Sequence, residues 1–258
     1  MSLLAIVLFQ PGPFRAESVP VRYREGSVHG FLALRTLDGK ILGAGDLTQT
    51  VRGNRVVSRL VFRFKDGSVD DETAVFSQQR VLRLISDHHI QKGPSFPKPT
   101  DVSIDALAGR VIVHYIDKRE EKVEQEQMEL PSDLANGIIL NILKNIQPDT
   151  AETKVSYLAA TPKPRLVKLS IVRHGEERFS VVGARYKARL FVLKVELGGI
   201  AGVIAPVIGK QPPDTRVWVV ANGTPAFVKA EQSLFPGGPV WRIEMTSPAW
   251  PNAPQSQR

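Results

Sequence analysis

The sequence contains no cysteine, and this absence removes several kinds of chemistry at once. Disulfides, thiolate nucleophiles, cysteine-rich zinc sites and lipid attachment through an N-terminal cysteine are all excluded. No apolar run reaches the roughly 18 residues that a membrane-spanning helix needs. The nucleophile elbow, the phosphate-binding loop and the dinucleotide fingerprint are also missing, so the sequence predicts no cofactor.

The excess of positive charge lies entirely in the second part of the chain. Residues 1–150 hold 19 basic and 19 acidic side chains, whereas residues 151–258 hold 15 and 7. Such a distribution favours an anionic membrane surface or an acidic partner, or else indicates a solvated basic surface. Nucleic acid is a less favoured partner, because no recognised nucleic-acid-binding motif accompanies the charge.

The N-terminus is a short apolar run, Met1–Phe9, followed by Gln10–Pro13. It resembles the core of a secretory signal without its basic leader, and a first strand is the alternative. We therefore predict a leader over 1–18, one β-rich domain over 19–247 and a disordered tail over 248–258. A periplasmic or cell-envelope location is the expectation, and the cytoplasm is the alternative.

Short alternating segments separated by tight turns predict a mainly β protein. In Arg55–Phe64 the apolar residues Val56, Leu60, Phe62 and Phe64 share one face, and arginines occupy the other. Twenty glycines and nineteen prolines favour many short strands. We expect an antiparallel sheet with one buried face, strongly curved or forming an unclosed barrel. The expected strands are Val28–Thr36, Ile41–Val51, Arg55–Phe64, Asp71–Ser77, Val81–Ser86, Asp101–Asp105, Arg110–Ile116, an edge strand at Lys122–Leu130, Lys154–Thr161, Arg165–Val172, Arg178–Val182, Tyr186–Leu197 and short strands at Arg216–Val220, Pro225–Lys229 and Val240–Met245.

The hairpin turns of this sheet are predicted from Asp-Gly and Gly-Asn pairs. They occur in Leu37–Lys40, Arg52–Asn54 and Lys65–Ser68. These residue types tolerate the positive φ of tight turns. The three prolines in Gly93–Thr100 exclude regular structure there.

One helix is predicted over residues 132–146. Ser132 is its expected N-cap, Asp133 suits the positive N-terminal end, and Pro148 follows the last turn. Apolar residues recur at four-residue steps on one side, which predicts packing against the sheet. These residues include Leu134, Ile138, Ile142 and Ile146.

The order of these elements resembles a group of uncharacterised bacterial envelope proteins. The residues that carry the likeness are Leu130–Ala135 at the helix start, Trp218–Val220 and Pro225–Lys229. That group is similar to the lipoprotein carrier and receptor fold of the Gram-negative periplasm. The resemblance implies an unclosed, strongly curved sheet with a helical element over an apolar concave face. Carriers have more helices at this face, and none of their ligand-gating residues is matched here.

The segment Gly198–Gly209 is apolar throughout and rich in glycine. Three interpretations are open: a strand pair within the core, the lining of a hydrophobic cavity, and insertion into a membrane. Together with nearby aromatic residues and the helix, it predicts a pocket for an apolar ligand. The residues of this predicted pocket are Ile200, Val203, Ile204, Val207, Ile208, Trp218, Phe227, Trp241, Ile138 and Ile142.

Asp87-His88-His89 is the one cluster with the residue types for catalysis or metal binding. Neighbouring side chains of a strand point to opposite faces, so His88 and His89 would need a loop to share an ion. We predict no metal site. The acidic residues Asp70-Asp71-Glu72 are expected to form a turn, and they lack the spacing of a calcium loop.

Three functional hypotheses follow. The first is a non-enzymatic envelope protein that binds a lipid or other apolar ligand in the concave face of the sheet. The second is an interaction module whose basic C-terminal half docks on an anionic membrane or acidic partner. The third is an enzyme that uses the residues around Asp87. Nothing in the sequence determines the oligomeric state.

Overall fold

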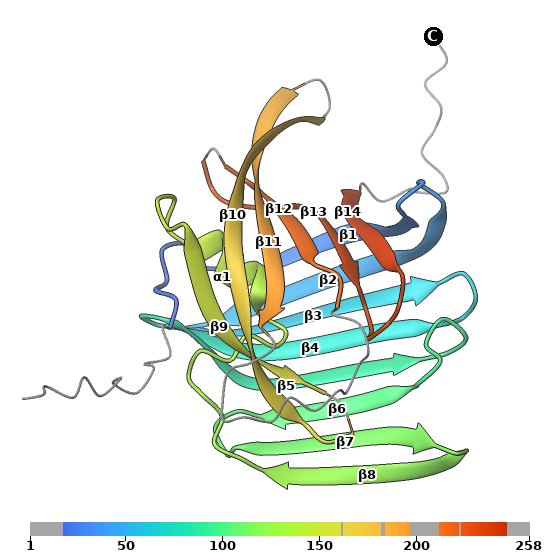
Figure 1. Cartoon of the computed structure of the whole chain (residues 1–258). Coiled ribbons are helices and arrows are strands. Elements are labelled where there is room, and N and C mark those ends of the chain that lie inside the picture. Colours follow the sequence, from blue (N-terminus) through green and yellow to red (C-terminus); the bar gives the residue numbers. More distant parts are fainter. Residues whose placement is uncertain (1–17, 161, 182–183, 197–211, 222, 247–258) are drawn as a thin grey trace, which may run out of the picture.

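The computed structural model describes residues 18–246 except 161, 182–183, 197–211 and 222 (Figure 1). The apolar segment Gly198–Gly209, with its five predicted pocket residues, therefore lies outside the described residues, as do the expected leader up to residue 17 and the expected tail. Among the helices of the described part of the chain, none is long and apolar enough to cross a bilayer.

The described residues form strands β1–β14 and one short helix, α1. In chain order their bounds are β1 Val28–Thr36, β2 Ile41–Arg52, β3 Arg55–Phe64, β4 Val69–Gln78, β5 Leu82–Lys92, β6 Thr100–Asp105, β7 Arg110–Asp117, β8 Glu120–Gln127, α1 Ile139–Asn145, β9 Glu152–Ala159, β10 Arg165–Val181, β11 Ala184–Glu196, β12 Thr215–Val220, β13 Phe227–Ser233 and β14 Val240–Thr246.

All fourteen strands belong to one antiparallel sheet. Its order is β8 to β1 followed by β14 down to β9, so β8 and β9 are the two edges and are not hydrogen-bonded to each other. The sheet curves until β9–β11 cross the broad face formed by β2–β6 (Figure 1). The predicted fold class, a mainly β protein with a curved, unclosed antiparallel sheet, is confirmed, and so is the edge position of the strand after residue 120.

Alternation along the strands separates a core face from a wet face. In β3, Val56, Phe62 and Phe64 are buried, while Arg55, Arg59 and Arg63 are exposed. The buried side chains join a continuous apolar cluster that includes residues of both arms of the sheet and of α1. Burial of this face stabilises the curvature, since each large side chain removed from water contributes about 1.5–3 kcal/mol.

The three predicted glycine turns are confirmed as hairpin connections. Gly39, Gly53 and Gly67 have φ values of 95°, 60° and 87°. Only glycine enters this region without a steric penalty, which explains the residue type at each turn. The segment after β5 is irregular up to Thr100, as its prolines predict, and it contributes the buried ring of Phe96 to the core.

The predicted helix is wrong in its extent. Helix α1 begins at Ile139, and Ile138 is its N-cap without any side-chain hydrogen bond. Gly137 has φ +65°, which a right-handed helix cannot contain. Ser132 does not cap the helix; its hydroxyl hydrogen-bonds that of Ser18. Asp133 instead accepts bonds from Ser156 and Lys168.

Residues 134–136 pair with the edge strand β9 and do not form part of the helix. Leu134 forms a parallel bridge with Ser156, and the Ala135 N–H donates to the Ser156 carbonyl at 2.9 Å. The Asn136 amide both donates to and accepts from the backbone of Leu158, at 3.0 and 2.8 Å. These bonds cover part of an edge that would otherwise present unpaired backbone groups.

Two strands differ from their predicted lengths. Arg165–Val172 and Arg178–Val182 belong to the single strand β10, which continues through a bulge between Arg173 and Glu176. With β11 it forms a hairpin that projects beyond the rest of the sheet (Figure 1). Strand β5 extends past Ser86 to Lys92, so Asp87-His88-His89 lies in a strand.

The segment before β1 attaches α1 to the sheet. The Asn145 side-chain oxygen accepts bonds from the backbone N–H groups of Arg22 and Tyr23, at 2.7 and 2.8 Å. Lys144 lies 2.5 Å from Glu25, whose backbone N–H donates to Gln78 of β4. The helix is thus held from the solvent side by polar contacts and from the inner side by apolar packing.

Replacing Gly137 with Ala tests this arrangement. The new Cβ would lie 2.6 Å from Ala74 Cβ and 2.7 Å from Asp87 Oδ1, at a φ that alanine disfavours. We expect the free energy of unfolding to fall by about 2 kcal/mol or more. Urea unfolding measures this, with Gly26→Ala as the control, because nothing lies within 4 Å of its Cβ. An equal, small effect of both substitutions would contradict the packing described.

Candidate functional site

The described members of the predicted apolar pocket do not lie together. Ile138 and Ile142 are buried with Trp241 in the core, where the Trp241 ring lies 5.3 Å from that of Phe64. In the register Trp218 lies opposite Lys229, and Lys229 lies opposite Glu244. These three side chains point to the outer face of the sheet, so Trp218 does not face the core. The Lys229 ammonium sits 4.1 Å above its ring. Of the predicted pocket residues, Ile138, Ile142 and Trp241 thus belong to the core, and Trp218 belongs to the outer face.

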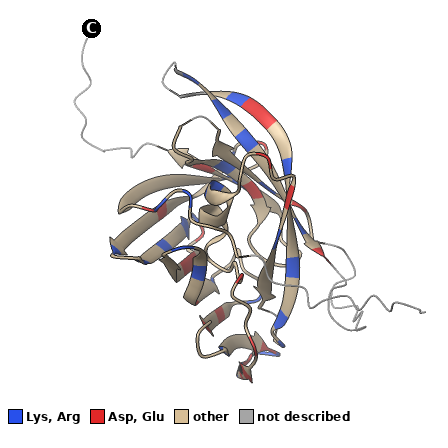
Figure 2. Ribbon diagram, turned by 90° about the vertical axis from the view of Figure 1, so that its left-hand side faces the viewer, with Lys and Arg blue, Asp and Glu red and all other residues tan. Residues whose placement is uncertain are grey.

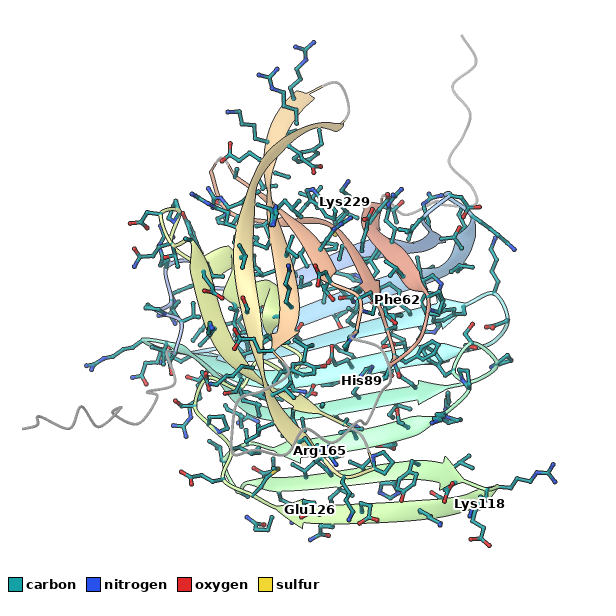
Figure 3. All side chains as sticks on the ribbon, in the orientation of Figure 1. Phe62, His89, Lys118, Glu126, Arg165 and Lys229 are labelled. Carbon is teal, nitrogen blue, oxygen red and sulfur yellow. The ribbon has the colours of Figure 1, made fainter. Side chains whose placement is uncertain are left out.

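Phe227 lines a surface cleft of about 370 Å³. The lining of the cleft comes from the projecting β10–β11 hairpin and from β12, β13 and β14, and the residue Lys229 labelled in Figure 3 belongs to it. The rings of Phe179 and Tyr186 stack there at 5.5 Å across the hairpin. Tyr186 and Met245 are 42% and 47% exposed, so the apolar lining is open to solvent. The complete lining is Phe179, Tyr186, Val220, Phe227, Val228, Lys229, Glu244 and Met245.

His88 and His89 point to opposite faces of β5, as the alternation predicts. His88 Nε2 lies 2.8 Å from Asp101 on the outer face. His89 Nε2 lies 3.0 Å from Asp70 on the inner face, and the two imidazoles share no partner. No group of three or more His, Asp and Glu side chains within the described ranges is arranged to hold a metal ion.

The inner face of β4 and β5 carries a cluster of titratable side chains, here called the inner acidic cluster: Asp70, Glu72, Asp87, His89 and Tyr157. The register places Glu72 opposite His89, and Asp70 opposite Gln91. Gln91 donates to Asp70 at 2.8 Å and to the Leu234 carbonyl at 2.8 Å. The prediction of an acidic turn over Asp70–Glu72 is therefore wrong, since both residues lie within β4.

Two segments from elsewhere in the chain enclose the inner acidic cluster. Gly137 approaches so closely that a Cβ there would lie 2.7 Å from Asp87 Oδ1. Tyr157 reaches the cluster from β9, the opposite edge of the sheet, and feels the charges of Glu72, Asp87 and Asp70. Glu72 and Tyr157 lie deep within the curve, and each is only partly buried.

Burial and mutual charge shift the protonation of this cluster. Burial raises the pKa of Asp87 well above its usual value, and the Glu72 carboxyl adds to the shift. Burial likewise raises the pKa of Glu72 and that of Tyr157. Burial alone would lower the pKa of His89, but the hydrogen bond that its ring N–H donates to Asp70 and the charges of the nearby carboxylates outweigh burial and raise the pKa to about 9.

A second cleft, of about 290 Å³, lies on the outer face over β5, β6 and β7. Its polar lining includes His88, Ser103 and Arg110. The His88 and Asp101 side chains are 49% and 44% exposed, so water competes for their hydrogen bond. This surface lacks the enclosure that shifts the protonation of the inner acidic cluster.

Sequence reasoning missed the inner acidic cluster except for Asp87 and His89. The alternation along β4 indicates this cluster. Phe76 and Ala74 are apolar residues of the inner face, and Glu72 and Asp70, two and four residues before Ala74, lie on the same face. Tyr157 had no such signal, because its place depends on how far the sheet curves.

Fold and site together define a protein built on one curved, unclosed antiparallel sheet with a polar cluster inside its curve. The crystal structure of a beta-barrel-like protein of Domain of Unknown Function DUF1849 from Brucella abortus is similar in fold, with a TM-score of 0.46 and 11% identity. The alignment covers 90% of this chain and 97% of that one. No family model matches the sequence, and no curated protein matches it either.

The shifted groups predict a stability that decreases with rising pH. The folded pKa of His89 lies above its unfolded value of 6.5, so its contribution is complete below pH 6.5 and is lost as the pH rises through about 9. The raised pKa values of Asp87 and Glu72 act in the same direction.

Thermal unfolding followed between pH 6.5 and 9 measures this dependence, and His89→Gln is expected to flatten it. His88→Gln is the matched control on the same strand and should retain the wild-type slope. A His89→Gln slope equal to that of the wild type would show that His89 is not the titrating group.

Proposed function

We propose that this protein is a non-enzymatic binding protein for an amphiphile with an acyl chain and an anionic head group. The apolar chain occupies the cleft beside Phe227, and the head group lies near Lys229, the basic residue of the cleft lining. The observation that carries this proposal is the open cleft of about 370 Å³ with stacked aromatic rings. Its volume falls in the range of about 300–1,000 Å³ that is typical of small-molecule sites.

The exposed apolar side chains of the cleft favour an apolar ligand. Tyr186 and Met245 leave large apolar surfaces in water, and covering them gains about 25 cal/mol per Å². Phe227 and the stacked pair Phe179–Tyr186 give the cleft aromatic walls, and because aromatic side chains have few rotatable bonds, little entropy is lost when they are ordered on binding.

The charge of the neighbouring hairpin favours an anionic head group. Residues 165–196 contain eight basic side chains and three acidic ones, and the projecting hairpin carries several basic segments in Figure 2. In the register Arg178 lies opposite Lys187, on the face of the hairpin that points away from Phe179 and Tyr186, whereas Lys229 lines the cleft itself. These cations attract an anion over roughly a Debye length of 10 Å.

This proposal moves the ligand away from the place expected for a lipoprotein-carrier-like protein. The concave face next to α1 is filled by apolar side chains such as Ile138 and Phe62, so the open apolar surface lies at the hairpin end instead. A periplasmic or cell-envelope location and the likeness to the lipoprotein carrier fold remain part of the proposal.

Native mass spectrometry of gently purified protein, with an organic extract analysed beside it, tests the proposal. We expect a stoichiometric additional mass that matches a fatty acid or phospholipid. Phe227→Asp and Met245→Asp place a charge in the cleft and should each reduce the bound fraction by about tenfold or more.

Val123→Asp is the matched control, because Val123 is 55% exposed on β8, away from the cleft. Replacing Ile204 and Ile208 with Asp asks in addition whether the apolar segment contributes to retention. Retention of the same mass by folded Phe227→Asp and Met245→Asp proteins would refute the proposed cleft.

The alternative function, docking on an anionic membrane without a bound ligand, rests on the same basic hairpin. It predicts binding to anionic vesicles that weakens steeply with salt, and Arg178→Glu with Lys187→Glu should abolish it. An amphiphile held in the cleft should persist at high salt, because apolar burial is not screened.

A further inference from the structure

Lys229 is the basic residue of the cleft lining, and a tryptophan ring holds its ammonium group. The Lys229 Nζ atom lies 4.1 Å from the centroid of the Trp218 ring, and the two residues are directly opposite each other in the register of β12 and β13. An ammonium over an indole face is attracted by the ring, most strongly where water is partly excluded. Trp218 is 5% exposed, so its ring is largely withdrawn from water. Trp218 therefore holds the cation in place before any ligand binds.

The acidic side chains around Lys229 are engaged by arginines. Its cross-strand neighbour Glu244 also lines the cleft. The Glu244 carboxylate oxygens lie 3.4 Å from Arg35 Nε and 3.8 Å from Arg242 Nε. Arg242 also donates to Glu231. Among the described residues, the partner of the Lys229 ammonium is a ring and not a carboxylate, so its N–H donors are available to a ligand.

We propose that Lys229 makes the cleft selective for a carboxylate head group, so that its ligand is a free fatty acid. The ammonium donates hydrogen bonds to the carboxylate oxygens while the acyl chain covers Phe227 and Met245. Trp218 acts as a positioning residue, since it holds the ammonium and does not itself line the cleft. This inference rests on the proposed amphiphile binding and narrows it to one class of ligand.

Charge and size favour a carboxylate over a phosphate. A phosphomonoester carries about 1.5–2 negative charges at pH 7, and more than one cation is needed to match it. Lys229 supplies one positive charge, and Glu244 directly across from it repels a second negative charge. Arg178 and Lys187 add no cation to the cleft, because they lie on the other face of the hairpin. A volume of about 370 Å³ is near the lower end for small-molecule sites and suits one acyl chain better than the two of a phospholipid.

Isothermal titration of the full chain with four single-chain probes tests this proposal. The probes are decanoate, decyl phosphate, decanol and decylammonium, each kept below its micelle concentration at pH 8 and constant ionic strength. We expect decanoate to bind about tenfold or more tightly than decanol, because hydrogen bonds to a charged group add to the burial of the same chain. Decyl phosphate and decylammonium should both bind less tightly than decanoate.

The four probes separate a failure of this inference from a failure of the proposed function. Equal affinities for decanoate and decyl phosphate would overturn the selectivity for carboxylates and leave the binding of an anionic amphiphile intact. Equal affinities for decanoate and decanol would remove the role of Lys229. If none of the four probes binds, both the inference and the proposed function are refuted.

Lys229→Met removes the cation and keeps an apolar stem of similar length. It should weaken decanoate binding by about tenfold or more and leave decanol binding within about twofold of the wild type. Lys122→Met on the edge strand β8 is the matched control and should bind decanoate as the wild type does. A Lys229→Met protein that keeps its affinity for decanoate, or that loses decanol to the same extent, would contradict the assignment.

Two substitutions of Trp218 test its positioning role. Trp218→Leu should weaken decanoate binding by about threefold to fivefold, which is the size of a cation–π contact, and Trp218→Phe should retain most of the affinity because it keeps an aromatic face. Decanol binding should be the same in both variants. A loss of decanol and decanoate binding together in Trp218→Leu, without rescue by Trp218→Phe, would show that Trp218 has only a structural role.

Discussion

The structure depends on covering the inner face of a sheet that does not close. Strands β8 and β9 are its two edges and share no hydrogen bonds, so backbone pairing alone does not fix the curvature. Apolar burial fixes it instead: Leu34, Phe62 and Phe191, from different parts of the sheet, are almost fully buried in one cluster. Helix α1 fills the space between them, and residues 134–136 pair with part of the β9 edge. The curvature of the sheet, the position of α1 and the pairing of residues 134–136 with β9 thus all depend on covering a sheet that does not close.

This arrangement places the open apolar cleft and the inner acidic cluster in positions that the sequence did not predict. The helix and the core side chains occupy the concave face, where a carrier-like protein would hold its ligand. An open apolar cleft occurs instead beside the projecting hairpin. The curve also brings Tyr157 from one edge of the sheet over Glu72 and Asp87 of the other arm. The titratable cluster on the inner face is therefore enclosed. The hydrogen bond between His88 and Asp101 on the outer face is open to solvent.

The amino-acid sequence is sufficient for the fold class but not for the sites. Alternation in segments such as Arg55–Phe64 and the glycine turns depend on local physics, and the structure confirms them. The helix start failed because Gly137, at φ +65°, ends the helical register that the four-residue apolar spacing suggested. Asp70 and Glu72 were misplaced because acidic residues on the inner face of a strand contradict the usual pattern. The approach of Tyr157 depends on the curvature, which no local pattern encodes.

The central functional claim is that the cleft beside Phe227 holds an acyl chain, and methionine NMR tests it most directly. The chain has three methionines, of which Met245 lines the cleft and Met128 follows the edge strand β8. With ¹³C-methyl-labelled methionine, titration of a fatty acid that carries a nitroxide on its chain should broaden the Met245 signal at low ratios and leave Met128 sharp. Equal broadening of both signals, or a Met245 signal that stays sharp at saturation, would contradict the account.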